Sequence, residues 1–230
     1  MMKKTTSETT LNFYLVEDKL KTLDFFKNFE THQSLNIHGS IAVVGNSPNI
    51  IGKGLGSKID TYDNVVRFNH AKVEGLEHDV GSKTTHIIIN CHLYNGYDLK
   101  SAGFEGFDYG FWDFYKEVKP TILYINTNPV TPGNRGTVPK DFPFYVMPAN
   151  SFNQIGPFYG LSNLPTIGCA FVGAMLSVDV KPSLFGFSID QTGHGHYFES
   201  RPNPSVSHNH KEEHKLLLDW KSQGFIDIAL

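Results

Sequence analysis

The residues with the clearest chemical potential are histidines near the carboxyl end of the chain. Five of the 11 histidines fall within a span of 21 residues, namely His194, His196, His208, His210 and His214. Their His-x-His pairs, and the i, i+4 spacing of the last two on a helix, are compatible with zinc binding. The zinc-protease pattern requires a glutamate directly after its first histidine, however, and Lys211 follows His210. A metallohydrolase is therefore a minor alternative, and because the chain also lacks Asp-x-Asp, we expect no metal and no other cofactor.

A second candidate is the loop that follows the apolar run at 41–44. It reads Gly45-Asn46-Ser47-Pro48-Asn49 and continues through Gly52, Gly54 and Gly56. Backbone N–H groups of a glycine-rich loop after a strand can face a phosphate, although these spacings match neither the P-loop nor the dinucleotide fingerprint. The amides of Asn46, Asn49 and Asn69 can both donate and accept, which suits a base edge, a ribose or a phosphate. Turn-forming Asn and Gly are the structural alternative.

The elements that must position these residues alternate between short apolar runs and helical patterns. Runs typical of buried parallel strands lie at 41–45, 65–69, 85–90, 121–127, 144–147, 183–189 and 225–228. Helical patterns occupy 11–30, 166–178 and 209–222, the last ending at Gly224. The first is amphipathic, which predicts packing on the sheet or, less favoured, on a membrane surface. This order predicts an α/β doubly wound sheet that binds its ligand beyond the carboxyl ends of the strands.

The predicted domain organisation is simple. An amphipathic segment at 1–38 precedes a single domain at 39–230, and we expect 91–164 to be an insertion on the acceptor side. That span is rich in aromatic residues, among them Phe111, Trp112 and Tyr115. Aromatic faces stack well on sugars, so the span could line an acceptor site, with ordinary core packing as the alternative.

Composition excludes several classes of protein. The chain has 230 residues, is 40% hydrophobic and carries a formal net charge of −3, which argues against disorder and against nucleic-acid binding. Two cysteines, Cys91 and Cys169, are too few for a disulfide framework. No apolar run exceeds about six residues, against the ~20 needed to span a bilayer. We therefore expect a soluble chain without signal peptide or anchor.

Four blocks of the sequence resemble, in order, the motifs of the animal-type sialyltransferases, glycosyltransferase family 29. Residues 41–89 are similar to the large sialylmotif, with AVVGNS at 42–47, VVRFN at 65–69 and DVGSKTTH at 79–86. Residues 165–187 resemble the small motif, HYFE at 196–199 resembles the third motif, and His208-x4-Glu213 resembles the very small motif. The resemblance implies a single Rossmann-like, mostly parallel sheet flanked by helices, a GT-A-like variant, and an inverting, metal-independent glycosyltransferase.

Departures from the family pattern concern the compartment and the donor. Ile41 and Asp179 stand where the family places two disulfide-bonded cysteines, which favours a reducing compartment. Ile167 replaces a Ser or Thr expected near the donor's carboxylate or phosphate. The implied donor is a CMP-activated sugar of the sialic acid type, with CMP-Kdo as a rival, and a non-catalytic CMP-binding protein is the alternative outside the enzyme class.

The resemblance also implies roles for individual residues. His208 would be the base that takes a proton from the acceptor hydroxyl, and His196 would contact the departing CMP phosphate. Glu199 and Glu213 would support them. The residues expected to bind the donor are Asn46, Ser47, Asn49, Asn69, Thr166, Gly168 and Gly186.

The expected partners are a CMP-sugar donor and a glycan acceptor, of which a lipid-linked glycan is one form. Since CMP-sugars are made in the bacterial cytoplasm, a bacterial or viral enzyme acting there fits these departures. The predicted location is cytoplasmic, with peripheral contact at the inner membrane face allowed.

Overall fold

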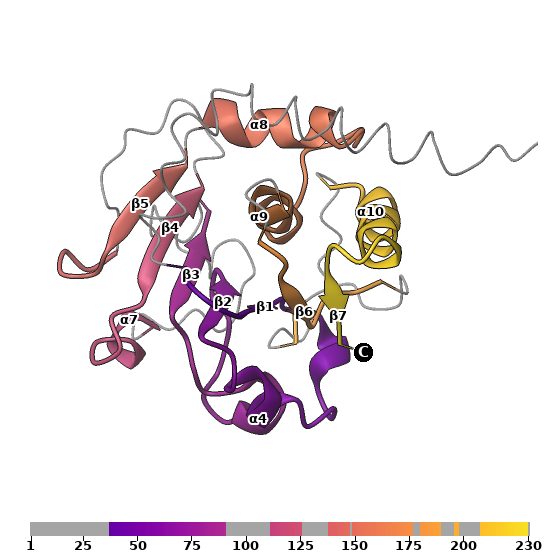
Figure 1. The fold of residues 1–230 in the computed structure, drawn as a ribbon. Helices are drawn as coiled ribbons and strands as arrows, with labels where there is room; N and C mark the ends of the chain where they lie inside the picture. Colours follow the sequence, from indigo (N-terminus) through magenta and orange to yellow (C-terminus); the bar gives the residue numbers. More distant parts are fainter. Residues whose placement is uncertain are drawn as a thin grey trace, which may run out of the picture.

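The computed structural model describes residues 37–90, 111–125, 138–147, 149–176, 180–189, 196–197 and 208–229. Within these residues, seven parallel strands form one sheet in the order β5-β4-β3-β2-β1-β6-β7 (Figure 1). The strands are β1 (Ile41–Val44), β2 (Asn64–Phe68), β3 (His86–Ile89), β4 (Thr121–Ile125), β5 (Phe144–Met147), β6 (Ser183–Phe185) and β7 (Asp227–Ile228).

Helices cover both faces of the sheet. They are η1 (Pro48–Ile50, a 3-10 turn), α4 (Gly56–Ile59), α5 (Glu77–Val80), α7 (Phe111–Phe114), α8 (Ala149–Phe158), α9 (Ile167–Leu176) and α10 (His210–Ser222). Figure 1 shows α8, α9 and α10 on one side of the sheet and α4 and α7 on the other. The predicted α/β class, a parallel sheet flanked by helices, is confirmed.

The strand runs are continuously apolar because both faces of the sheet are covered. Side chains alternate between the faces along each strand. Ile41 and Val43 pack into the cluster formed with α9 and α10, whereas Ala42 and Val44 pack with residues of α4 and α5. All four side chains are at most 2% exposed.

The strand order predicts a ligand-binding crevice at one point of the sheet. From β1 the chain adds β2 to β5 in one direction, and it then returns to place β6 and β7 on the other side of β1. The strand order therefore reverses at β1. In open α/β sheets such a switch point, at the carboxyl ends of the strands, is where ligands bind.

Predicted and observed elements differ mainly at their ends. The run at 183–189 forms a strand only as far as Phe185, because the backbone turns at Gly186, where φ is +63°. The run at 225–228 forms only the short strand β7. Phe225 lies in the turn that follows α10, where its N–H donates to the carbonyl of Trp220. The helix at 149–158 was not predicted, and the amphipathic pattern at 11–30 lies outside the described residues.

The span 91–164, predicted to be an insertion, contributes β4 and β5 to the central sheet. These two strands are therefore part of the core of the fold. Trp112 and Tyr115 are 9% and 2% exposed and pack with strand residues, among them Ile87 and Ile122. For these two aromatic residues the core-packing interpretation is the correct one. A role of the remaining span in acceptor binding stays a prediction.

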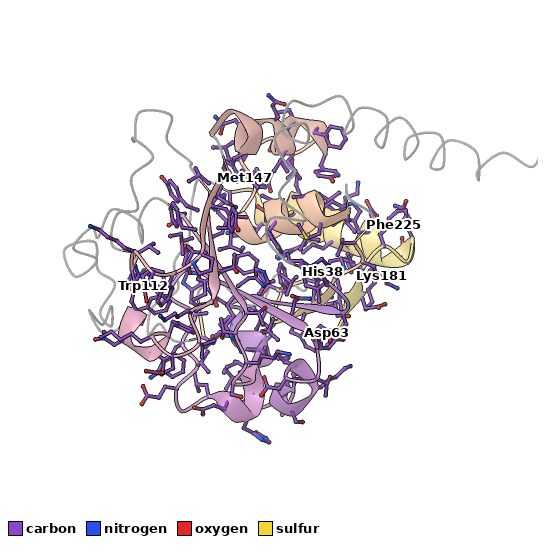
Figure 2. All side chains as sticks on the ribbon, turned by 60° about the vertical axis from the view of Figure 1, so that its left-hand side comes forward. His38, Asp63, Trp112, Met147, Lys181 and Phe225 are labelled. Carbon is purple, nitrogen blue, oxygen red and sulfur yellow. The ribbon has the colours of Figure 1, made fainter. Side chains whose placement is uncertain are left out.

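The amino ends of β1 and β2 are joined by hydrogen bonds. The backbone N–H and the hydroxyl of Ser40 both donate to Asp63 at 2.7 Å, which joins the starts of β1 and β2. In Figure 2 His38, Asp63 and Lys181, which precede β1, β2 and β6, lie toward the same side of the molecule. In the described part of the chain, no helix combines the length and apolar character needed to cross a bilayer.

Candidate functional site

The predicted crevice, at the carboxyl ends of β1 and β6, adjoins two glycines in close contact. Gly45 donates its N–H to the carbonyl of Phe185 at 2.8 Å, and Ser47 donates to the carbonyl of Gly186 at 2.9 Å. A Cβ atom at Gly45 would lie 2.5 Å from the oxygen of Gly186, and one at Gly186 would lie 2.6 Å from the oxygen of Gly45. Only glycine at both positions allows this approach. Of the two, the predicted donor-binding set contained Gly186 alone.

Asn46 follows β1 directly, and the two polar atoms of its amide differ in their hydrogen bonding. Its Nδ2 donates to the carbonyl of Phe68 at the end of β2, at 3.1 Å. Its Oδ1 is buried and finds no hydrogen-bond partner among the residues that the structure describes. Buried acceptors in native proteins nearly always have a partner, so this oxygen is suited to receive a donor group of a ligand.

The polar groups of Ser47 are used within the protein. Its hydroxyl lies 2.7 Å from that of Ser188 and accepts the N–H of Asn49 at 3.3 Å, which caps the turn η1. Ser47 thus ties β1 to the segment after β6. Asn49 is half-buried in η1, and the predicted donor contacts of both residues stay predictions.

Asparagines end two neighbouring strands. Asn69, which follows β2 with φ +48°, accepts the N–H of Asn90 through its Oδ1 at 3.0 Å and donates its own N–H to Ile88 at 2.8 Å. It thereby fixes the ends of β2 and β3 against each other. Asn90 was not predicted as a site residue, although its place directly after β3 repeats that of Asn69 after β2.

The glycines further along the loop have a different role. Gly54 donates its N–H to the carboxylate of Asp79 at 2.8 Å, and the N–H groups of Gly52 and Gly54 lower the pKa of Asp79. A Cβ atom at Gly56 would lie 1.9 Å from the carbonyl oxygen of Glu77, so this glycine lets α4 pack directly on α5. These N–H groups therefore do not form the phosphate cradle that the glycine spacing allowed.

Arg67 connects two parts of the segment that resembles the large motif, VVRFN and DVGSKTTH. Its guanidinium is fully buried, and Nη2 donates to the carbonyls of Val80, Gly81 and Lys83 at 2.8, 3.0 and 2.9 Å. Nε donates to the hydroxyl of Thr84 at 2.8 Å. The arginine of VVRFN thus holds the loop of DVGSKTTH, which is an architectural role.

His196 is brought to the crevice by the residue that follows it. Tyr197 donates its N–H to the carbonyl of Asn46 at 2.9 Å and its hydroxyl to the carbonyl of Lys72 at 2.7 Å. His196 therefore lies against the loop after β1, where the predicted contact with a phosphate can be made. Glu199 lies outside the described residues.

The start of α9 adjoins the same crevice. Gly168 lies in the first turn, where an added Cβ would be 3.4 Å from the ring of Phe187, and this ring is also the neighbour of Gly45. Thr166 caps the helix by accepting the N–H of Cys169 at 3.2 Å. Phe187 thus links the predicted small-motif residues to the end of β1, a contact that the sequence did not indicate.

Glu213 joins α10 to the cap of α9. Its carboxylate accepts the N–H and the hydroxyl of Thr166 at 2.9 and 2.6 Å. The side chain is only 5% exposed, and burial raises its pKa, against the lowering effect of these hydrogen bonds. The predicted supporting residue therefore acts on Thr166, and the hydroxyl of Thr166 is already engaged by it.

His208 precedes α10 and has a defined orientation. Its Nδ1 lies 2.8 Å from the carbonyl oxygen of Leu164. Because a carbonyl oxygen can only accept, Nδ1 carries the proton in the neutral ring and Nε2 keeps its lone pair. That is the form of histidine that can act as a general base.

Comparisons with known proteins identify the family of this chain. The model of glycosyltransferase family 29, sialyltransferases, matches residues 3–105. A CMP-N-acetylneuraminate-beta-1,4-galactoside alpha-2,3-sialyltransferase of Homo sapiens is 32% identical over 206 residues, covering 76% of this chain and 53% of that protein. This chain belongs to glycosyltransferase family 29.

A shorter sequence match and a similarity of fold add to this result. A beta-galactoside alpha-2,6-sialyltransferase 2 of Takifugu rubripes is 52% identical over 54 residues, 24% of this chain and 10% of that protein. The fold is similar to that of a mammalian sialyltransferase crystallised with Gal-beta-1-3GalNAc-ortho-nitrophenol, with a TM-score of 0.60, 20% identity and coverage of 94% and 84% of the two chains. The chain spans about half the length of the curated full-length relatives it matches over most of its sequence.

Two other histidines of the carboxyl-terminal cluster, His210 and His214, lie near His208. The ring centroids of His208 and His210 are 6.0 Å apart, and those of His210 and His214 are 6.4 Å apart. Within the described ranges, no three His, Cys, Asp or Glu side chains are grouped so that they could hold a metal ion. His194 lies outside those ranges, and the expectation of metal independence stays a prediction.

Proposed function

We propose that this chain transfers a sialic acid from a CMP donor to a glycan hydroxyl, with inversion and without a metal. The observation that carries the proposal is the orientation of His208, whose Nδ1 donates to Leu164 and whose Nε2 is left as a base. The donor specificity is supported by the relatives, whose names specify CMP-N-acetylneuraminate. Their names also specify galactosides, so we propose glycans that end in galactose as acceptors.

In the proposed reaction the donor occupies the crevice between β1 and β6. The buried Oδ1 of Asn46 accepts a hydrogen bond from the nucleotide, and His196 lies against the same loop, where it can face the phosphate. As the bond between the anomeric carbon and the phosphate oxygen breaks, His196 donates a hydrogen bond to the oxygen that gains negative charge. CMP leaves as a phosphate monoester, an acceptable leaving group without a metal.

The acceptor hydroxyl attacks the opposite face of the anomeric carbon. Nε2 of His208 removes its proton while the new carbon–oxygen bond forms, so one bond breaks, one forms and one proton moves to the imidazole. Attack opposite the departing CMP inverts the configuration. Glu213 contributes indirectly, since it holds the cap of α9 against the helix that follows His208.

We also propose that the enzyme works in a reducing compartment such as the cytoplasm. Ile41 is buried at the start of β1, where the family places a cysteine of its disulfide, and Cys169 is a buried free thiol. Burial raises the pKa of Cys169, which disfavours the reactive thiolate. A lipid-linked acceptor met at the inner membrane face fits this location.

The test is to incubate the purified protein with CMP-N-acetylneuraminate and CMP-Kdo separately, with and without galactose-terminated glycans, and to measure CMP release and product mass. The expected result is acceptor-dependent release from CMP-N-acetylneuraminate that survives EDTA and reducing agent. A preference for CMP-Kdo would show that CMP-Kdo, rather than CMP-N-acetylneuraminate, is the donor. Binding of CMP without release would favour a non-catalytic CMP-binding protein, and activity abolished by removal of a stoichiometric metal would favour the metallohydrolase.

A further inference from the structure

The carbonyl that orients His208 lies in a segment held by α10 on both sides. Leu164 is the acceptor of the Nδ1 proton of His208. Two residues later, Thr166 is bound through its N–H and hydroxyl by Glu213. Two residues earlier, Ser162 is bound by the adjacent helix residue, Glu212. The oxygen on which the orientation of the base depends is therefore placed between two carboxylates of α10.

The bonds on the Ser162 side are as short as those on the Thr166 side. Glu212 Oε2 accepts the N–H of Ser162 at 2.7 Å and its hydroxyl at 2.9 Å. Asn209 Nδ2 donates to the same hydroxyl at 3.1 Å, and Asn209 also caps α10 by accepting the N–H of Glu212. Hydrogen bonds to an ionised carboxylate are about twice as strong as neutral ones, so this contact can fix the loop although it is partly exposed.

We propose that Glu212 and Ser162 are positioning residues for the base of the transfer reaction, an inference that rests on the proposed function. Neither is one of the residues that define the family's motifs, since Ser162 precedes the small motif and Glu212 occupies an unspecified position of His208-x4-Glu213. Together they fix the carbonyl of Leu164, which selects the Nδ1–H form of His208 and sets the direction of Nε2. A base displaced by about 1 Å can lose about 10²-fold in rate.

The chain offers matched variants for the test. Glu212→Ala removes the carboxylate, Glu212→Gln keeps an acceptor oxygen, and Ser162→Ala removes the hydroxyl while keeping the N–H that donates to Glu212. Asp219→Ala is the control, because Asp219 is an exposed acidic residue on the same helix. Each variant is measured for kcat, for KM of the CMP donor and for the imidazole nitrogen shifts of His208 by NMR.

We expect Glu212→Ala to lower kcat about 10- to 100-fold with KM for the donor changed less than about twofold. Glu212→Gln should recover most of this loss, Ser162→Ala should show a smaller loss, and the control should show none. On a His208→Ala background, Glu212→Ala should have no further effect on kcat. The nitrogen shifts should report the Nδ1–H form in the wild type and a mixture of the two neutral forms in Glu212→Ala.

A kcat within twofold of wild type, or an equal loss on the His208→Ala background, would overturn the proposal. If Glu212→Ala does not fold, Ser162→Ala decides by the same measurements. If the wild type shows no transfer, the proposed function fails. The nitrogen shifts then still decide whether Glu212 and Ser162 orient His208, because that measurement needs no turnover.

Discussion

Two parts of one loop look alike in sequence and differ in what their polar groups do. Gly45-Asn46-Ser47 and Gly52–Gly56 lie within twelve residues of each other, and both are rich in residues that form turns. In the second part the backbone N–H groups are directed at Asp79, and Gly56 lets two helices touch. In the first part the buried Oδ1 of Asn46 has no hydrogen-bond partner in the part of the chain that the structure describes. Composition alone therefore does not distinguish the two parts of the loop. They are distinguished by whether their buried polar groups have hydrogen-bond partners.

The contrast extends to the two ends of the sheet. At the amino ends, Asp63 accepts two hydrogen bonds from Ser40, and the amide of Asn64 donates to two backbone carbonyls. At the carboxyl ends, Oδ1 of Asn46 has no partner among the described residues, and we predict that Nε2 of His208 takes the proton of an acceptor hydroxyl. Substitutions at the carboxyl ends should therefore change function, and substitutions in the closed regions should change stability.

The largest effect is expected at the carboxyl ends of the strands, where we propose that His208 is the base. His208→Ala should lower kcat by about 10²–10⁴, the usual contribution of a general base, with little change in CMP affinity or in the unfolding temperature. Kinetics, calorimetry with CMP and thermal unfolding measure the three quantities. His210→Ala, at the first residue of α10, is the matched control. Activity of His208→Ala within threefold of wild type, or an equal loss in the control, would remove His208 from the mechanism.

The next effect concerns the structural part of the loop. Gly56→Ala forces a Cβ atom to within 1.9 Å of the Glu77 oxygen, so α4 must move away from α5. We expect the free energy of unfolding in urea to fall by about 1–3 kcal/mol while CMP affinity is retained. Ser57→Ala, an exposed neighbour, should change stability by less than about 0.5 kcal/mol. Loss of CMP binding without loss of stability would show that this part of the loop contacts the nucleotide.

A smaller effect is expected at the open acceptor. Asn46→Ala removes the buried Oδ1 and should weaken CMP binding about tenfold, which corresponds to the ~1.4 kcal/mol of one buried hydrogen bond. The lost bond to Phe68 should cost about 1 kcal/mol of stability. Asn64→Ala, at the opposite end of β2, removes a similar amide bond and should affect stability alone. Equal CMP affinities of Asn46→Ala and Asn64→Ala in calorimetry would contradict the assignment.

The smallest effect is a pH dependence of stability. The N–H groups of Gly52 and Gly54 lower the pKa of Asp79 below its ordinary value of 3.8, so the native state favours the carboxylate more than the unfolded chain does. The resulting stabilisation is complete above the unfolded pKa and is lost as the pH falls through the native pKa. Asp79→Asn should therefore lower the urea midpoint at neutral pH, and its difference from wild type should shrink below about pH 4. A difference that does not vary with pH would mean that the charge of Asp79 contributes nothing.

Much of the fold was predictable because periodicity is a local property. The runs at 41–44 and 121–125 are buried on both faces and read as strands without any knowledge of their partners. The helix at 209–222 was predicted from its apolar spacing and from Gly224, and the structure has it at 210–222. The helix at 149–158 was missed because its sequence contains Pro157, two asparagines and a glycine, which are weak helix formers stabilised here by packing of Phe152 and Ile155.

The sequence by itself determined the fold class, the family and the residues from which the candidate site is built. Motif order and residue type are local information, and they suffice to indicate His196, His208 and Glu213. Only the tertiary structure decided which of the glycine N–H groups close on Asp79, that Glu213 holds Thr166, and that Leu164 orients His208. These pairings join residues 25, 47 and 44 positions apart. No local pattern specifies them, because they arise from the way the sheet and its helices bring distant loops to one edge.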